Sequence, residues 1–404
     1  MRTFESAAAA EAFISEVIDQ PLVSAVQEPQ PGITLAQSVM EKPAGAFANV
    51  YDLSFVDEDV RPEIIAFGGL NSTHKFLSQG GRRYNVATSG GFFYLADIGS
   101  STPRQRPLNL SVSEGELLSL PVVDRYAVIA GSDDLTARKL AALGMLDLNG
   151  RSIMWSGSLT DYDTEAKVYG NGNVVINHQN DALTGTQRVL DESSRYTPPI
   201  EQEGYKDVGF ISRGDNEFVG VGGSNDGGVD IFAHDFVVRC PEKYFQGVSV
   251  LTVQTIGGIS LERFTGGAFS AGPALNTADF SNDPVNLDRS LGGRPPFADV
   301  AMARTVLFRD AEGYTHIRLF DGRPGSPVFP GVTPDEAVQQ IVAGHDIVWG
   351  CFLDPGQTAK LSVREDAGVM SYGNRHYMRW PSPANPNFIW TPELGRLVAN
   401  VIVL

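Results

Sequence analysis

Residues 304–320 read RTVLFRDAEGYTHIRLF, and this stretch decides the fold class. Two apolar runs, Thr305–Arg309 and Tyr314–Phe320, flank a short polar turn that ends in Gly313. Runs rich in β-branched and aromatic residues on either side of a short glycine-containing loop are typical of a β-hairpin. The stretch therefore predicts two antiparallel strands.

The second strand of this hairpin also carries a histidine. Ile317 and Leu319 alternate along it with His316 and Arg318. Successive side chains of a strand point to opposite faces, so the alternation predicts one apolar and one polar face. We therefore expect His316 on a solvated face rather than in a functional site.

Outward from the hairpin, short apolar runs such as Val122–Ala130 alternate with turn residues. The 404 residues include 43 Gly and 24 Pro, which favours many turns over long helices. Two helices are nevertheless predicted. Thr333–Glu336 is a capping box with proline at the first helical position, and its helix ends before Gly344. A weaker helix is predicted from Asp133 to Leu143.

These elements predict an α+β fold: mixed or antiparallel sheets rich in strands, with a few inserted helices. Strands and helices do not alternate regularly, which argues against a doubly wound parallel sheet. Apolar spacing predicts a further helix over Phe4–Ile18, before three prolines. We therefore divide the chain into an N-terminal helical extension, residues 1–40, and a single large domain, residues 41–404. The extension packs on this domain or, in a homo-oligomer, on a second copy.

Charge and hydropathy exclude several classes of partner. The chain has 31 basic and 48 acidic residues, a formal net charge of −17. Such a surface repels nucleic-acid phosphates and anionic lipids, so we expect neither nucleic acid nor membrane as a partner. The N-terminal residues carry charges where a signal peptide needs an apolar segment, which predicts a cytoplasmic protein, or a secreted one if a leader was removed.

Metal and nucleophile motifs are missing from the sequence. It contains no P-loop, no H-E-x-x-H and no G-x-S-x-G, and its six histidines lack metal-ligand spacing. Cys240 and Cys351 cannot form a zinc site alone and are predicted to be buried thiols. We therefore predict no metal ligands and no cofactor. Ser224–Asp230 has oxygen ligands near glycines, as a Ca²⁺ loop has, but it fits an ordinary turn better.

Four segments combine glycines or charges with strand-like runs. Paired glycines at the end of a strand allow close approach of the backbone to a ligand. Loop ends on a rigid scaffold also collect functional residues. The segments are Ser89–Phe93, Gly272–Leu275, the hairpin ends at Arg304 and Asp321–Arg323, and Phe352–Thr358.

The order of these segments resembles the phosphodiester glycosidase family, the catalytic domain of N-acetylglucosamine-1-phosphodiester alpha-N-acetylglucosaminidase and its bacterial relatives. That family has, in order, N-G-G-F-F, G-P-x-L, R-T, D-G-R, a threonine-capped helix, L-D-G-G-G-S and a closing E-R-x-V-x-N-like strand. The resemblance covers roughly residues 45–404. The counterparts here are Ser89–Phe93, Gly272–Leu275, Arg304-Thr305, Asp321–Arg323, Thr333–Gly344, Leu353-Asp354, and Arg396, Val398 and Asn400.

The resemblance implies a bacterial hydrolase that cleaves the glycosidic bond of a sugar-1-phosphodiester or a related phosphorylated carbohydrate-like metabolite. It implies that Asp354 is the leading catalytic carboxylate and Asp321 its partner. Arg304 and Arg323 would bind the phosphate, because guanidinium groups match its oxygens bidentately. The substrate-binding set is completed by Ser89, Gly90, Gly91 and Thr358.

Two departures from the family pattern keep other functions open. Ser89 replaces the family asparagine, and Pro355-Gly356-Gln357 replaces the glycines after the aspartate. Proline has no N–H and fixes φ, so this loop offers a phosphate fewer donors. The alternatives are a non-catalytic carbohydrate- or phosphodiester-binding protein with a degenerate site, and a related hydrolase or transferase whose substrate has no phosphodiester.

Overall fold

The structure, a computed structural model, describes most of the chain. The described residues are 2–79, 83–93, 107–131, 134–157, 163–174, 176–181, 185–247, 250–275, 300–379, 381, 385–393 and 395–404.

The fold is mainly β, so the prediction of an α+β protein is wrong. Strands account for 49% and helices for 14% of the residues that the structure describes. The helix predicted over Asp133–Leu143 is one source of the error. Asp133 lies outside the described residues, and the rest forms strand β10 (Leu135–Leu140) and the start of strand β11 (Leu143–Leu148). Pairing of β10 with β9 (Arg125–Ala130) outweighs the local helical pattern.

A six-stranded sheet contains the predicted hairpin, which is confirmed. Its two strands pair antiparallel, with Leu307 opposite Ile317. The sheet has the order β2-β3-β4-β23-β22-β24. The strand bounds are β2 Ala25–Gln30, β3 Ile33–Glu41, β4 Phe47–Phe55, β22 Arg304–Asp310, β23 Thr315–Asp321 and β24 Ile347–Phe352.

A five-stranded sheet, β26-β25-β6-β29-β5, packs against the six-stranded one. Leu53 and Leu319 of the first sheet and Val363 and Ile402 of the second share one buried cluster. The two sheets thus form a sandwich that buries its apolar faces. The strand bounds are β5 Glu63–Asn71, β6 Val86–Ser89, β25 Leu361–Glu365, β26 Gly368–Tyr372 and β29 Val398–Val403.

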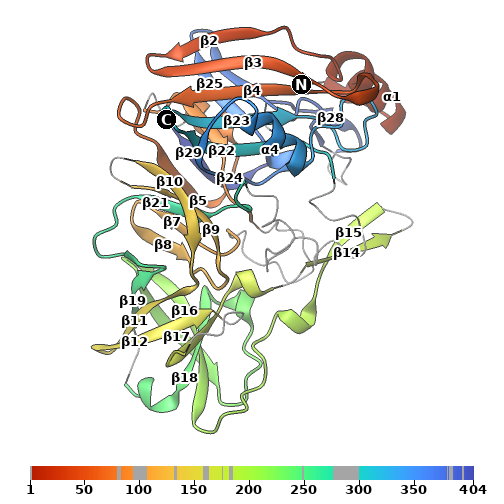
Figure 1. The fold of residues 1–404 in the computed structure, drawn as a ribbon. Helices are drawn as coiled ribbons and strands as arrows, with labels where there is room; N and C mark the ends of the chain where they lie inside the picture. Colours follow the sequence, from red (N-terminus) through yellow and green to blue (C-terminus); the bar gives the residue numbers. More distant parts are fainter. Residues whose placement is uncertain are drawn as a thin grey trace.

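A closed barrel stands at the other end of the molecule (Figure 1). The sheet β11-β12-β13-β18-β16-β17-β19 closes because β11 also pairs with β19, and β20 (Ile259–Ser260) extends it. Trp155, Phe210, Phe218 and Phe236 are buried in its core. The remaining barrel bounds are β12 Arg151–Gly157, β13 Ala166–Tyr169, β16 Tyr205–Gly214, β17 Glu217–Ser224, β18 Phe236–Pro241 and β19 Val250–Ile256.

Three smaller sheets complete the architecture. A five-stranded sheet, β10-β9-β21-β7-β8, lies between the barrel and the sandwich (Figure 1). The others are β1-β28-β27 and β14-β15. The new bounds are β1 Arg2–Phe4, β7 Ser111–Ser113, β8 Glu116–Ser119, β14 Ile176–Asp181, β15 Gly185–Leu190, β21 Gly267–Ser270, β27 Met378–Arg379 and β28 Phe388–Trp390.

Helices are short. Helix α4 (Pro334–Val342) begins at the predicted capping box, in which the Thr333 and Glu336 side chains each accept a bond from the other's backbone N–H. Helix α2 spans Thr73–Gln79. Helix α1 spans Ala7–Phe13 and continues as one π-helical turn, Ile14–Ile18. None of the helices in the described ranges has the length and apolarity to cross a membrane.

The first 40 residues are only partly helical. After α1 the chain forms β2 and β3, which belong to the six-stranded sheet. Helix α1 packs on the small sheet of the same chain, where Phe13 meets Trp390 edge to face at 5.0 Å. The segment is therefore joined to the main body by both strand pairing and aromatic packing.

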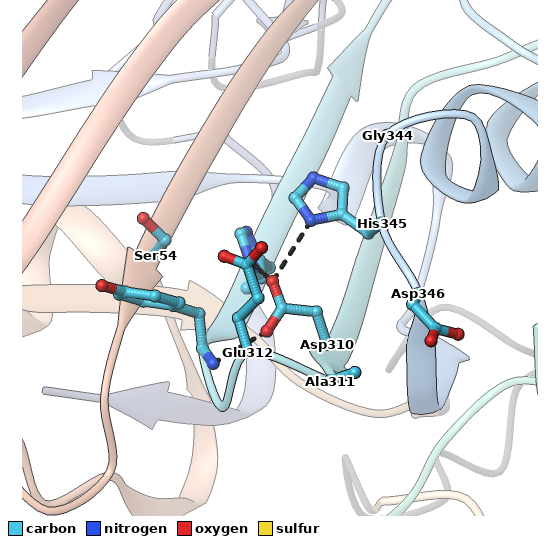
Figure 2. A pocket seen from close by; sticks show the side chains of 9 residues that line it. Ser54, Asp310, Ala311, Glu312, Gly344, His345 and Asp346 are labelled. Atoms are coloured by element: carbon cyan, nitrogen blue, oxygen red, sulfur yellow. Dashed lines mark hydrogen bonds and ion pairs between the residues drawn. The ribbon is translucent and has the colours of Figure 1, made fainter.

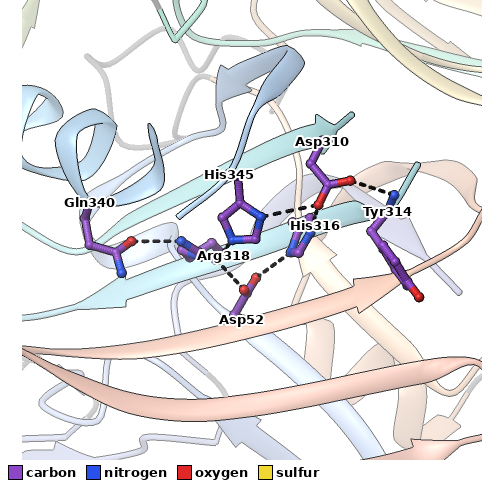
Figure 3. Close-up of polar contacts among 7 residues, drawn as sticks. All are labelled: Asp52, Asp310, Tyr314, His316, Arg318, Gln340 and His345. Atoms are coloured by element: carbon purple, nitrogen blue, oxygen red, sulfur yellow. Dashed lines mark hydrogen bonds and ion pairs between the residues drawn. The ribbon is translucent and has the colours of Figure 1, made fainter. Parts of the chain in front are cut away.

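His316 is buried, at 5% exposure, so the prediction that it lies on a solvated face is wrong. Helix α4 and the loop after it cover this face of the sheet. Gln340 of α4 accepts a hydrogen bond from Arg318, and His345 packs edge to face on His316 (Figure 3). Cys240 and Cys351 are buried thiols, as predicted.

Closure of the barrel gives the first prediction. Gly144 of β11 pairs with β19, and a Cβ there would lie 2.0 Å from the Thr255 carbonyl oxygen. We expect Gly144→Ala to lower the free energy of unfolding by about 3 kcal/mol, because a backbone oxygen cannot move aside. Urea titration, with tryptophan fluorescence as the signal, measures this change in the free energy of unfolding.

Gly222 of β17 is the matched control, since a Cβ there meets nothing within 4 Å. Gly222→Ala should change the free energy of unfolding by less than about 1 kcal/mol. Equal effects of the two alanines would show that β11 does not close on β19.

Candidate functional site

The turn after β6 is fixed by the last strand of the chain. The Gly90 N–H donates to the Asn400 carbonyl oxygen at 3.1 Å, and the Gly91 N–H donates to Asn400 Oδ1 at 2.7 Å. A Cβ on Gly90 would lie 2.2 Å from Asn400 Oδ1, and one on Gly91 would lie 2.2 Å from the Ser270 carbonyl oxygen. The paired glycines are thus required by close packing of the chain on itself.

The Asp354 turn lies directly on this glycine turn. The Asp354 N–H donates to the Gly90 carbonyl oxygen at 3.0 Å, and the Gly356 N–H donates to the Ala303 carbonyl oxygen at 2.7 Å. The Thr358 hydroxyl donates to the carbonyl oxygens of Asp354 and Pro355. The Thr358 hydroxyl and the Gly356 N–H therefore hold the turn together, and Asp354 is left half-buried at its start.

Asp321, at the end of β23, has no exposed surface. Its Oδ1 accepts hydrogen bonds from the backbone N–H groups of Gly322 at 3.0 Å and Asn374 at 2.8 Å. Burial raises the pKa of this carboxyl group to about 6, although both hydrogen bonds and the charges of Arg375 and Lys360 oppose the rise. The group therefore changes charge near pH 6.

Asn374 connects Asp321 to the Asp354 turn, and the charge of Lys360 acts on Asp321. The Asn374 amide donates to the carbonyl oxygens of Gly356 at 2.9 Å and Ala359 at 2.7 Å. Lys360 is 2% exposed, and its ammonium donates to the Pro392 carbonyl oxygen. Burial lowers the pKa of Lys360 to about 8, against the attraction of Asp321 and Glu393. No sequence motif marked Asn374 or Lys360, because each acts through residues remote in the chain.

The two arginines at the hairpin have different partners. Arg304 is 2% exposed and donates to the carbonyl oxygens of Val332 at 2.8 Å and Val300 at 2.7 Å. Burial lowers the pKa of its guanidinium to about 9, while Glu336 raises it. Arg304 thus holds β22 to the residues before α4 through the Val332 carbonyl group.

Arg323 binds carboxylates of the N-terminal segment. It lies 2.7 Å from Asp19 Oδ2 and 2.9 Å from Glu11 Oε2. The Ser326 hydroxyl also donates to Asp19 Oδ2, at 3.1 Å. Arg323 and Ser326 therefore converge on one anionic group, which in this structure is the side chain of Asp19.

Buried polar atoms without a protein partner concentrate in these segments. Among the described residues, Asp321 Oδ2 and the amide Oδ1 of Asn374 are two such atoms. Buried polar atoms are hydrogen-bonded in most proteins, so a group of exceptions marks a place where water or a ligand takes part. The other such atoms in these segments are Ser89 Oγ, Thr305 Oγ1, Asn400 Nδ2, Asp19 Oδ1 and Arg323 Nε.

The loop considered for calcium uses its carboxylate internally. Asp230 forms an ion pair with Arg195 at 2.6 Å and accepts the Phe232 N–H at 2.9 Å. Gly227 and Gly228 both have positive φ, as in tight turns. Asp226, the other acidic residue, is exposed.

Architecture and site together define a mainly β protein with a polar cluster where β6 and β23 end and β29 begins. No protein-family model and no curated protein matches the sequence. A hypothetical protein from Synechocystis has a similar structure, with a TM-score of 0.54 and 14% identity. The alignment covers 95% of this chain but 63% of that one, so the chain spans less than two thirds of it.

Two weaker structural similarities were also found. A protein from Burkholderia pseudomallei assigned as exported gives a TM-score of 0.49 at 15% identity, covering 91% of this chain and 75% of that one. The zebrafish N-acetylglucosamine-1-phosphodiester alpha-N-acetylglucosaminidase catalytic domain, auto-inhibited by its pro-peptide, gives 0.41 at 12% identity, covering 95% and 88%. At these identities the similarity concerns the fold alone.

Burial of Asp321 predicts a pH dependence of stability. Its pKa rises from 3.8 to about 6 on folding, so its contribution is complete below pH 3.8 and is lost as pH rises through about 6. Asp321→Asn keeps an acceptor for both backbone N–H groups and removes the charge. Between pH 4 and pH 7.5, we expect this variant to gain about 2 kcal/mol in unfolding free energy relative to wild type.

Urea titrations at several pH values measure this difference. Asp366→Asn, which removes an exposed carboxylate in the β25–β26 turn, is the control and should shift by less than about 0.5 kcal/mol over the same range. If the difference in unfolding free energy between Asp321→Asn and wild type does not change with pH, the raised pKa of Asp321 is contradicted.

Proposed function

We propose that the chain is a hydrolase that cleaves the glycosidic bond of a sugar-1-phosphodiester or a related phosphorylated carbohydrate. One observation carries the proposal: segments that resemble the phosphodiester glycosidase motifs meet through direct hydrogen bonds. Gly91 and Asn400 are 309 residues apart in sequence, yet they are hydrogen-bonded, and Gly90 in turn accepts from Asp354. Contacts between residues so far apart in the sequence indicate that these residues share one structural role or one functional site.

Asp354 is the proposed catalytic carboxylate. It is half-buried at the start of its turn, so a substrate can reach it. Breaking the C1–O bond passes through an oxocarbenium-like transition state, which a carboxylate stabilises by attacking C1 or by activating water. The phosphate monoester is a good leaving group, and the demand for a general acid is therefore modest. The proposal needs no cofactor.

Asp321 is proposed as a positioning residue rather than as a second carboxylate at the substrate. It has no exposed surface, and its Oδ1 orients the backbone of Asn374. Asn374 then holds the carbonyl groups of Gly356 and Ala359, on either side of Thr358. Loss of Asp321 would therefore act on the Asp354 turn through Asn374.

Arg323 with Ser326 is the proposed phosphate-binding pair. Both donate to the Asp19 carboxylate, and an anionic phosphate oxygen fits the same donors. Phosphate binding therefore requires that Asp19 leave Arg323. Arg304 donates to backbone carbonyl groups, and we propose a structural role for it instead.

A second candidate is a non-catalytic carbohydrate- or phosphodiester-binding protein. The Asp354 turn supports it, because Pro355 has no N–H and the Gly356 N–H donates to Ala303. Neither residue then offers a backbone donor to a phosphate. Ser89 has no exposed surface and leads into the glycine turn, so we propose a positioning role for it in either case.

Turnover of a panel of sugar-1-phosphodiesters tests the hydrolase. We expect wild type to release both free sugar and phosphate monoester, and Asp354→Asn to lower kcat/KM at least about 100-fold, because the amide neither attacks C1 nor accepts a proton from water. Coupled sugar detection and phosphorus NMR measure the two products.

Asp335→Asn, on the exposed N-terminal turn of α4, is the charge-matched control and should keep wild-type turnover. Full activity of Asp354→Asn would contradict the proposal that Asp354 is the catalytic carboxylate. Binding of a phosphodiester without release of sugar would favour the non-catalytic candidate.

A further inference from the structure

A pocket of about 270 Å³ lies at the turn of the β22–β23 hairpin, away from the proposed active site. Figure 2 shows Asp310, Glu312, His345 and Asp346 around it, and His316 also lines it. His316 is five residues from Asp321 along β23, which corresponds to roughly 17 Å of strand. The pocket is therefore a separate site.

Asp310 directs one carboxylate oxygen at both histidines (Figure 3). Its Oδ1 accepts the Tyr314 N–H at 2.9 Å, which fixes the side chain in the hairpin turn. Its Oδ2 lies 3.2 Å from His316 Nε2 and 3.3 Å from His345 Nδ1. One oxygen of Asp310 thus contacts a ring nitrogen of each histidine.

These separations are at the long end of the range for hydrogen bonds and also match the spacing of ligand atoms around a metal ion. N–H···O bonds in proteins centre near about 2.9 Å. In a tetrahedral zinc site with ligands at about 2.0–2.1 Å, neighbouring ligand atoms lie about 3.3 Å apart. The distances from Asp310 Oδ2 to the two nitrogens, 3.2 and 3.3 Å, are close to this spacing of neighbouring ligand atoms. The set of two imidazoles and one carboxylate is also one that zinc uses with a water as fourth ligand.

Asp52 of β4 supports one of the histidines from behind. Its Oδ1 lies 3.2 Å from His316 Nδ1, and in the Nδ1–H tautomer it accepts this proton while Nε2 faces the pocket. A carboxylate behind a histidine ligand in this way fixes the tautomer and the orientation of the ring. His316 also stacks on Phe308 at 4.5 Å, which holds the ring plane.

Only one of the two sides of the cluster can accept a cation. Ligand atoms of Asp52, His316 and His345 also lie within 4.8 Å of one another. Arg318 closes that side, because its guanidinium donates to Asp52 and lies 2.8 Å from His345 Nε2. The pocket side instead carries the carboxylates of Glu312 and Asp346, which attract a cation.

We propose that Asp310, His316 and His345 bind a divalent transition-metal ion such as Zn²⁺, through Asp310 Oδ2, His316 Nε2 and His345 Nδ1. The ion joins the β22–β23 turn to the loop between α4 and β24, and Glu312 and Asp346 form the acidic entrance. On binding, the His345 proton moves from Nδ1 to Nε2. Arg318 then leaves Nε2 and keeps Asp52 and Gln340 as partners.

Metal titration of the full chain, without a histidine tag and after treatment with a chelator, tests the site. We expect one Co²⁺ per chain with the visible absorption of a tetrahedral complex, displacement of Co²⁺ by Zn²⁺, and a higher Tm with saturating Zn²⁺. His345→Gln should weaken Co²⁺ binding by at least about 10-fold. His345 lies in a loop and is partly exposed, so this variant should fold.

Asp310→Asn is a second variant with the same expected loss, and Asp335→Asn is its control. Asp335→Asn also removes one negative charge, but Asp335 is exposed on the first turn of α4 and does not line the pocket, so affinity should change by less than about 3-fold. Circular dichroism of the metal-free proteins checks the fold of each. Absence of stoichiometric Co²⁺ and Zn²⁺ binding by wild type, or wild-type affinity in both ligand variants, would overturn the site.

Discussion

The contact between Asn400 and the glycine turn is the constraint on which the proposed active site depends. Strand β29 lies between β5 and β6, and its pairing with β6 brings Asn400 to the end of that strand. Because Gly90 and Gly91 have no side chains, Asn400 bonds both backbone N–H groups. The Asp354 turn then lies on Gly90. Assembly of the site therefore waits for the last strand of the chain, since no local segment can form it alone.

Sequence reasoning succeeded where the signal is local. The hairpin around residues 304–320 and the capping box at Thr333 are specified by neighbours within a few residues, and both form as predicted. It failed where pairing between remote strands decides. Leu135–Leu140 was predicted to be helical but pairs with β9 as a strand. His316 was predicted to be exposed but is buried beneath α4.

The same distinction between local and long-range signals applies to the residues of the candidate site. The resemblance indicated Gly90, Asp321 and Asp354, whose residue types sit in recognisable local patterns. Lys360 and Asn374 carry no such pattern, because their importance comes from the buried environment and from hydrogen bonds across strands. The partners of Arg304 and Arg323 could not be predicted either, since a residue near the N-terminus decides whether Arg323 meets a carboxylate.

The barrel is connected to the rest of the molecule by neighbouring strands. The chain enters it after β10 and returns as β21, and both strands pair with β9 in the same sheet. Entry and exit are therefore close together, which is the arrangement found where one domain is inserted into a loop of another. An inserted module of this kind can be lengthened, exchanged or lost in evolution with little entropic penalty for the remaining sheets.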